Sequence, residues 1–140
     1  MITPSAAPVD NGAITTTAID TLGAAYLTVY VAVLSIDALM TALKLRESEA
    51  SDLTGAVDVP GSIFGAAGAP ALPGAADDGK VYAFHMDLRG RQRYLDLVAG
   101  AGDGAAGTSV FAWAELSRLS EMPSTATQRG LAGELFVPKL

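Results

Sequence analysis

The chain has 140 residues, no cysteine, and a formal net charge of −6 from nine basic and fifteen acidic residues. The lack of cysteine excludes disulfides, thiolate catalysis and cysteine-containing zinc sites, and the acidic balance disfavours nucleic-acid binding, which needs a positive field to neutralise phosphates. Only 17% of the residues are charged, against roughly 25% in an average domain, which suggests that other chains cover part of the surface.

Residues 1–12 predict an extended N-terminal arm, because they contain two prolines and an Asp-Asn-Gly turn signal but little periodicity. They lack the basic start and apolar run of a secretory signal. The longest apolar run, residues 22–34, is too short to span a bilayer. We therefore expect a soluble protein with no membrane partner.

Residues 13–20 are rich in β-branched side chains and predict a short strand. In the next segment, residues 26–35, alternate side chains would fall on opposite faces of a strand. One face holds Leu27, Val29, Val31 and Val33, and the other holds Tyr26, Thr28, Tyr30 and Ala32. Because both faces are fairly apolar, we expect a central strand that is covered on both sides.

Residues 36–50 fit two interpretations. A helix is favoured by intrinsic propensity, by Ser35 as a cap, and by apolar residues at i, i+3, i+4 and i+7 spacing. Those apolar residues are Ile36, Leu39, Met40 and Leu43. In a strand, the inward side chains would be Thr41, Leu43 and Leu45, and the outward ones Met40, Ala42, Lys44 and Arg46. Propensity alone favours the helix.

Residues 51–79 are the longest irregular section, with a possible strand at residues 56–59 followed by a stretch dense in glycine, alanine and proline. A long stretch without its own periodicity inside a compact domain usually indicates a functional or partner-bound loop. Its apolar residues Ile63 and Phe64 are therefore candidate partner contacts. The adjacent carboxylates Asp77 and Asp78 are expected to lie in a turn.

Residues 78–100 predict a β-hairpin that turns at Arg89 and Gly90. The segment carries the only histidine, His85, which has neither the nucleophile and orienting carboxylate of a catalytic triad nor the further ligands of a zinc site. We therefore expect a structural histidine. The three arginines, Arg89, Arg91 and Arg93, are expected in internal ion pairs or a subunit contact rather than an anion site. Arg89 and Arg91 are candidate partner-binding residues.

Residues 108–119 alternate strongly and predict a last strand. Trp113 and the tyrosines are expected in the core rather than in a sugar-stacking platform. Residues 120–140 predict a C-terminal tail with an apolar patch formed by Leu135, Phe136 and Val137. An apolar patch on a tail indicates a partner-binding site.

No group of residues carries an enzyme signature. Glu47 and Glu49 are expected on a solvated face, and neither they nor Asp77 and Asp78 have the spacing of a calcium loop. We expect no catalytic, cofactor-binding or metal-binding residues. Strands spaced about eight to twelve residues apart between glycine-rich turns predict an all-β fold, an antiparallel sandwich or barrel. This domain would span residues 13–119, between an arm at 1–12 and a tail at 120–140.

The order of segments resembles a group of small capsid decoration (cement) proteins of tailed bacteriophages. The residues that carry the resemblance are Ala18, Ile19, Asp20, Thr21 and Gly23, then Leu45, Glu47, Ser48 and Glu49, then Val81, Tyr82, Gly90, Arg93, Tyr94 and Leu95. The resemblance covers residues 15–119. It departs from the family pattern at Glu49 and Ala50, where two aspartates are usual, and in residues 61–76, a longer loop than usual. Both departures lie in loops.

The resemblance implies a jelly-roll-like β-sandwich, with a strand rather than a helix over residues 39–46. It also implies a structural virion protein, without enzymatic activity or nucleic-acid contact, that binds the major capsid protein on the capsid exterior as a homotrimer. The arm, the loop at residues 61–76 and the tail would reach neighbouring subunits. The alternatives are a tail, neck or baseplate component, or a carbohydrate-binding β-sandwich module, and an enzyme is the weakest of them.

Overall fold

The computed structural model describes residues 3–4 and 8–120, and its regular secondary structure in these ranges is entirely β. The strands are β1 (Thr3–Pro4), β2 (Ala13–Thr15), β3 (Ile19–Asp20), β4 (Tyr26–Ser35), β5 (Ala42–Ser48), β6 (Val57–Ile63), β7 (Val81–Asp87), β8 (Tyr94–Gly100) and β9 (Ser109–Ser117). All pairings between them are antiparallel. This range therefore contains no helix long and apolar enough to cross a membrane.

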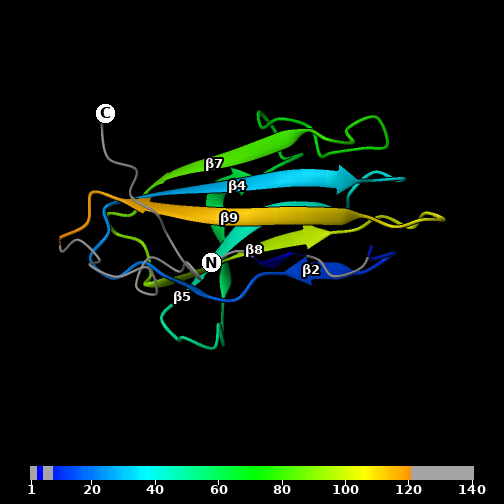
Figure 1. The fold of residues 1–140 in the computed structure, drawn as a ribbon. Coiled ribbons are helices and arrows are strands. Elements are labelled where there is room, and N and C mark those ends of the chain that lie inside the picture. Colours follow the sequence, from blue (N-terminus) through cyan, green and yellow to red (C-terminus); the bar gives the residue numbers. More distant parts are fainter. Residues whose placement is uncertain (1–2, 5–7, 121–140) are drawn as a thin grey trace, which may run out of the picture.

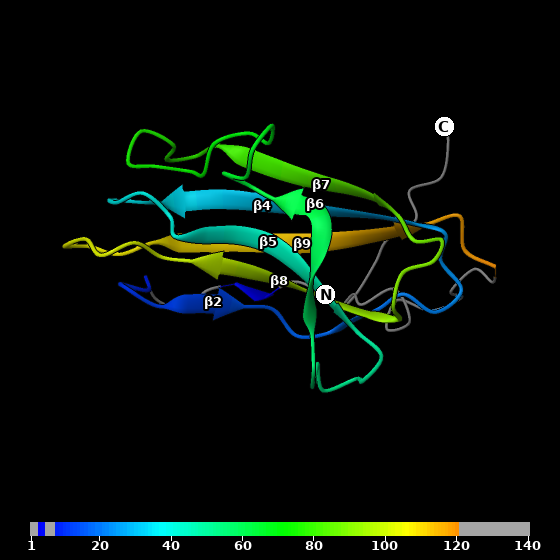
Figure 2. The same ribbon diagram turned by 180° about the vertical axis from the view of Figure 1, so that it is seen from behind.

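The strands form two sheets that lie face to face (Figure 1). One sheet has the strand order β1-β9-β4-β7, and the other has the order β2-β8-β5-β6, with β3 also paired to β8. Figure 2 shows the same arrangement from behind, where β5 and β6 lie in front of β4 and β9. The predicted all-β antiparallel sandwich is confirmed.

Apolar side chains from both sheets fill the space between them. The largest contributions are Leu27, Val29, Val31 and Val33 from β4, Leu43 and Leu45 from β5, and Leu95 and Leu97 from β8. Each of these side chains is at most 2% exposed. Because full burial of one such side chain contributes about 1.5–3 kcal/mol, this core holds the two sheets together.

β4 is central, as predicted, because it is hydrogen-bonded to β9 on one side and to β7 on the other. Its Leu27–Val33 alternation faces the core. The expectation that its second face is also covered is wrong for the described residues. Tyr26 and Tyr30 alternate with the core residues, so they lie on the outside of the sandwich, where both are only half-buried.

The strand interpretation of residues 39–46 is confirmed from Ala42 onward, and the helical one is wrong. Leu43 and Leu45 point into the core as expected. Met40 and Thr41 were expected to continue the alternation, but the regular strand begins only after them. Met40 is therefore buried and donates its backbone N–H to the Pro73 carbonyl at 2.9 Å, while Thr41 is exposed.

The predicted hairpin at residues 78–100 is wrong, although both of its strands exist. β7 pairs with β4, whereas β8 pairs with β5, β2 and β3 in the opposite sheet. Residues 88–93 therefore cross from one sheet to the other. Alternation shows which side chains of a strand face the core, but two strands that face each other across a core have the same alternation as two strands of a hairpin.

The bounds of two other predicted strands also differ from those in the structure. The predicted strand at residues 13–20 is divided into β2 and β3, and the one at residues 56–59 extends to Ile63. Two described parts of the predicted N-terminal arm pair with the sandwich. Thr3 lies opposite Ala112, and Val9 forms a bridge with Thr108.

Candidate functional site

The outer surface of the sheet β1-β9-β4-β7 carries most of the aromatic side chains that face outward. Alternation and register place them in rows across three strands, because Trp113 lies opposite Tyr30 and Tyr30 opposite Ala83. We call this surface the aromatic face. It comprises Phe111 and Trp113 of β9, Tyr26, Thr28, Tyr30 and Ala32 of β4, and Val81, Ala83 and His85 of β7.

The rings of the aromatic face contact one another. Tyr30 and Trp113 stack with ring centroids 4.9 Å apart and an interplanar angle of 21°. The Phe111 ring centroid lies 5.7 Å from that of Trp113, and the His85 ring centroid lies 6.5 Å from those of both Tyr26 and Tyr30. Such aromatic pairs contribute about 0.5–1.5 kcal/mol each beyond their buried area. The rings therefore form one continuous and partly ordered surface.

Few charged groups interrupt this surface. Glu115 lies opposite Thr28, Asp87 lies opposite Tyr26, and Arg118 lies over the Tyr26 ring at 5.7 Å, all toward one end. Toward the other end the surface continues into Leu34 and Val81, which are 57% and 58% exposed. The aromatic face is therefore the candidate functional site of the described residues, because extended apolar surfaces on folded domains are often contact sites.

The expectation that Trp113 and the tyrosines belong to the core is wrong for the aromatic face. Trp113, Tyr26 and Tyr30 are only partly buried, on the outside of the sandwich. Tyr82 is the tyrosine that packs against the core. The sequence does contain a signal for an outward aromatic surface. In residues 26–35 and 108–119, the positions that alternate with the core residues hold Tyr26, Tyr30, Phe111 and Trp113, and Glu115 is the charged residue among them.

The opposite outer surface, on β5, β6 and β8, is charged instead. We call it the charged face, and it comprises Lys44, Arg46, Asp58 and Asp96. Lys44 and Asp58 form an ion pair at 2.8 Å. Arg46 donates two hydrogen bonds to Asp96, whose side chain is fully buried. The hydrogen bond to Asp96 raises the pKa of Arg46. Each charge on this face therefore has a partner within the chain.

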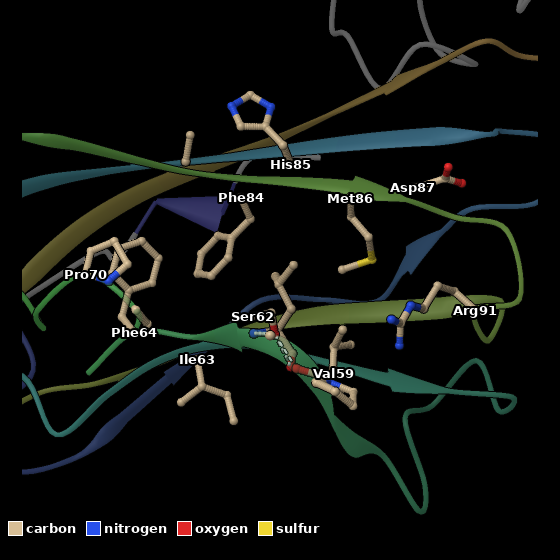
Figure 3. A pocket seen from close by; sticks show the side chains of 15 residues that line it. Val59, Ser62, Ile63, Phe64, Pro70, Phe84, His85, Met86, Asp87 and Arg91 are labelled. Atoms are coloured by element: carbon tan, nitrogen blue, oxygen red, sulfur yellow. Dashed lines mark hydrogen bonds between the residues drawn. The ribbon is translucent and has the colours of Figure 1, made fainter. Parts of the chain in front are cut away.

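A crevice of about 400 Å³ separates the edges of the two sheets, between β6 and β7. Figure 3 shows Phe84 and Met86 of β7 pointing into it, while His85 and Asp87 point away. Phe64 closes one end, with ring centroids 5.1 Å from Phe84. The crevice is thus lined mainly by apolar side chains.

Four predicted partner residues have described positions, and three of them line this crevice. Ile63 and Phe64 come from the end of β6 and the residue after it, and Arg91 comes from the connection to β8. Arg89 lies in that same connection, outside the crevice, with an 85% exposed side chain. Leu135, Phe136 and Val137 lie outside the described residues, so their predicted role stays a prediction.

The three arginines form ion pairs with three different carboxylates. Arg89 pairs with Asp87, Arg91 with Glu47 at 3.5 Å, and Arg93 with Asp20 at 2.7 Å. Of the two roles that we expected, internal ion pairing is therefore confirmed. The hydrogen bonds from Arg89 lower the pKa of Asp87 to about 2. With their charges neutralised in this way, the arginines do not form an open anion-binding patch.

His85 accepts or donates one side-chain hydrogen bond, with the Thr28 hydroxyl at 3.4 Å. The carboxylate nearest along β7, Asp87, is occupied by Arg89, so no triad geometry forms at this histidine. In the described part of the chain, no three His, Asp or Glu residues lie close enough together to hold a metal ion.

Glu47 differs from expectation, since it is nearly buried and not solvated. Its carboxylate accepts hydrogen bonds from Arg91 and from the backbone N–H of Gln92. Glu49 is exposed as expected. Asp77 and Asp78 have the expected turn roles, because Asp77 accepts from the Gly74 N–H and from Lys80, and Asp78 accepts from the Ile36 N–H.

We compared the chain with models of known protein families, with curated proteins and with solved structures. None of the three comparisons gave a match.

Proposed function

We propose that this protein is a structural virion protein, a capsid decoration (cement) protein of a tailed phage. It binds the major capsid protein on the outside of the head as a homotrimer and stabilises the capsid lattice. A protein that binds only the assembled lattice stabilises it by mass action. Such a role requires docking surfaces and no catalytic residues.

The aromatic face is the observation that carries this proposal. It is apolar over three strands, and its rings are already held by stacking before any partner binds. Aromatic side chains are enriched at the centres of protein–protein interfaces. On the charged face of the opposite sheet, each of the four ions has its partner within the chain, so this face does not need an external partner. A sandwich with one face of each kind is suited to lie flat on a larger assembly.

The strand order supports the jelly-roll assignment within this proposal. If β2 and β3 are counted as two parts of one strand, the five-stranded sheet has four strands, like its partner. The chain then changes sheet at every connection except the one between β5 and β6. Jelly rolls have eight strands in two sheets and are a recurrent fold of viral capsid proteins.

The ring geometry favours a protein partner over a carbohydrate. A sugar stacks on the exposed face of an aromatic ring, but Tyr30 and Trp113 cover one another's faces. Trp113 also has Phe111 beside it, and Tyr30 has His85. Rings that already contact one another in this way can also pack against the apolar side chains of a protein partner.

Electron cryo-microscopy of the assembled phage particle tests the proposal. We expect density for this chain repeated over the head lattice in groups of three, with the aromatic face toward the major capsid protein. Density confined to the neck or tail would contradict the cement role, and particles without this chain would contradict any virion role.

A further inference from the structure

Among the strands that the structure describes, β7 lies at the edge of its sheet and pairs on one side only, with β4. The Leu88 N–H donates to the Ala25 carbonyl, and Met86 and Phe84 lie opposite Leu27 and Val29. In an antiparallel ladder, the residues that alternate with these hydrogen-bonded pairs point their N–H and C=O groups the other way. For β7 those residues are Val81, Ala83, His85 and Asp87. No described residue pairs with their backbone groups, so β7 can accept a further strand.

The crevice lies beside this free edge. Residues 83–87 of β7 line it on one side, and residues 59–63 of β6 together with Phe64 line it on the other (Figure 3). A strand added to β7 would place alternate side chains over Phe84 and Met86 and inside the crevice. The volume of about 400 Å³ is far larger than the roughly 30 Å³ of one water, so it admits whole side chains. Backbone pairing together with side-chain pockets is the usual basis of strand addition.

The position of the last described residues indicates which segment reaches this edge. Ser117, at the end of β9, lies opposite Tyr26, and Tyr26 lies opposite Asp87. The chain beyond Ser120 therefore starts at the end of the sheet where β7 ends. A strand on the free side of β7 is three strand spacings from β9, about 14 Å. An extended chain spans about 3.3 Å per residue, so residues 121–133 are more than long enough.

We propose that the open edge of β7 and its crevice form an acceptor groove for the chain's own C-terminal segment, residues 134–137. This segment enters at the Asp87 end and runs antiparallel to β7. It consists of Glu134 and the apolar run Leu135, Phe136 and Val137, with Gly133 before it and Pro138 after it, a length suited to one short strand. Attachment to the same chain gives it a high effective concentration at the groove.

The orientation of the segment follows from Glu134. In a strand, Glu134 and Phe136 share one face, and Leu135 and Val137 share the other. Arg91, which lines the crevice, is already paired with Glu47, so a second carboxylate placed there would lose its hydration without gaining a free partner. Leu135 and Val137 therefore enter the crevice over Phe84 and Met86, and Phe136 extends the aromatic face beside His85.

This inference is independent of the proposed virion role, because it concerns the free protein. Its consequence is that the exposed strand edge is capped within one molecule, which protects it from pairing with other chains. A partner that takes up the tail would have to withdraw it from the groove first.

Paramagnetic relaxation enhancement in the full-length protein tests the contact. The chain has no cysteine, so the variant Lys139→Cys carries a single nitroxide just outside the segment. We expect strong broadening of the amide signals of Ala83, His85 and Met86, and little or none at Ile14 and Thr15 of β2, which lies at the far edge of the opposite sheet. A mixture of spin-labelled unenriched chains with ¹⁵N-enriched unlabelled chains should give no broadening. Broadening in that mixture, or at a different surface, would overturn the intramolecular groove.

Hydrogen exchange provides the second readout. We expect the Ala83 and His85 amides to exchange at least about tenfold faster in the double variant Leu135→Asp/Val137→Asp than in the wild type, since their strand partner is lost. The matched control Ala126→Asp/Gln128→Asp adds the same charge to the linker and should leave exchange unchanged. Protected amides of Val29 and Val31 in both variants report that the sandwich is folded. Equal exchange at Ala83 and His85 in all three proteins would overturn the proposal.

Discussion

The two outer faces of the sandwich are built from different chemistry on the same framework. On the charged face, side chains of β5, β6 and β8 are joined into ion pairs. On the aromatic face, side chains of β9, β4 and β7 stack on one another and leave apolar area open. Both sheets share one core, so the core does not cause the difference. A face that completes its interactions within the chain is suited to solvent, and one that does not is suited to a partner.

The largest expected effect on stability lies on the charged face. Arg46→Met leaves the Asp96 carboxylate buried without its partner, and loss of one member of such a pair costs about 3 kcal/mol or more of unfolding free energy. Urea denaturation at neutral pH measures it. The double variant Arg46→Met/Asp96→Leu should recover most of that loss, because both charges are then gone. A double variant as unstable as the single one would show that the ion pair itself, and not the unpaired charge, accounts for the loss.

The aromatic face should show the reverse pattern, with binding affected more than folding. Trp113→Ser removes the ring that stacks between Tyr30 and Phe111, and an interface residue of this kind contributes about 2 kcal/mol or more, roughly a thirtyfold loss of affinity. Co-sedimentation with capsid shells that lack this protein measures the affinity. Val57→Ser, at a 52% exposed apolar side chain of β6, is the matched control and should bind normally. Equal losses in the two variants would contradict a specific role for the aromatic face.

A smaller effect is expected where the charged face is open to solvent. Lys44 and Asp58 are 27% and 41% exposed, and pairs of this kind contribute at most about 1 kcal/mol. Lys44→Met should therefore lower the free energy of unfolding by less than Arg46→Met, and added salt should reduce the difference from wild type further. Denaturation at low and high ionic strength measures both. If Lys44→Met lowered the free energy of unfolding as much as Arg46→Met does, the exposure of an ion pair would not predict its contribution to stability.

The smallest effect concerns acid pH. Hydrogen bonds from Arg89 hold the pKa of Asp87 at about 2, below its usual 3.8, and those from Arg93 and Lys80 lower the pKa of Asp20 and Asp77. A lowered pKa contributes stability above the usual value, and that stability is lost as pH falls through the folded value. Stability should thus decline between pH 4 and about pH 2. Asp87→Asn should make the decline shallower, and an unchanged slope would exclude a contribution from this pair.

The sequence by itself determined which side chains form the core. The alternation in residues 26–35 and 94–100 separates Leu27, Val29, Leu95 and Leu97 from their neighbours, and all four are buried. It also indicated the absence of disulfides and the all-β class. These features depend on local periodicity and composition, which a linear sequence contains in full.

Only the tertiary structure decided which strands pair and which faces remain open. Residues 82–99 have the alternation of a hairpin, yet β7 and β8 lie in opposite sheets. The outward rings of Trp113 and Tyr30 were assigned to the core because an apolar residue in a strand has the same pattern whether a second layer covers it or not. Likewise, Glu47 is buried because residues 88–93 bring Arg91 and the Gln92 N–H to it. Strand pairing and the covering of a sheet face depend on contacts between segments that are distant in the sequence. Local periodicity does not encode such contacts.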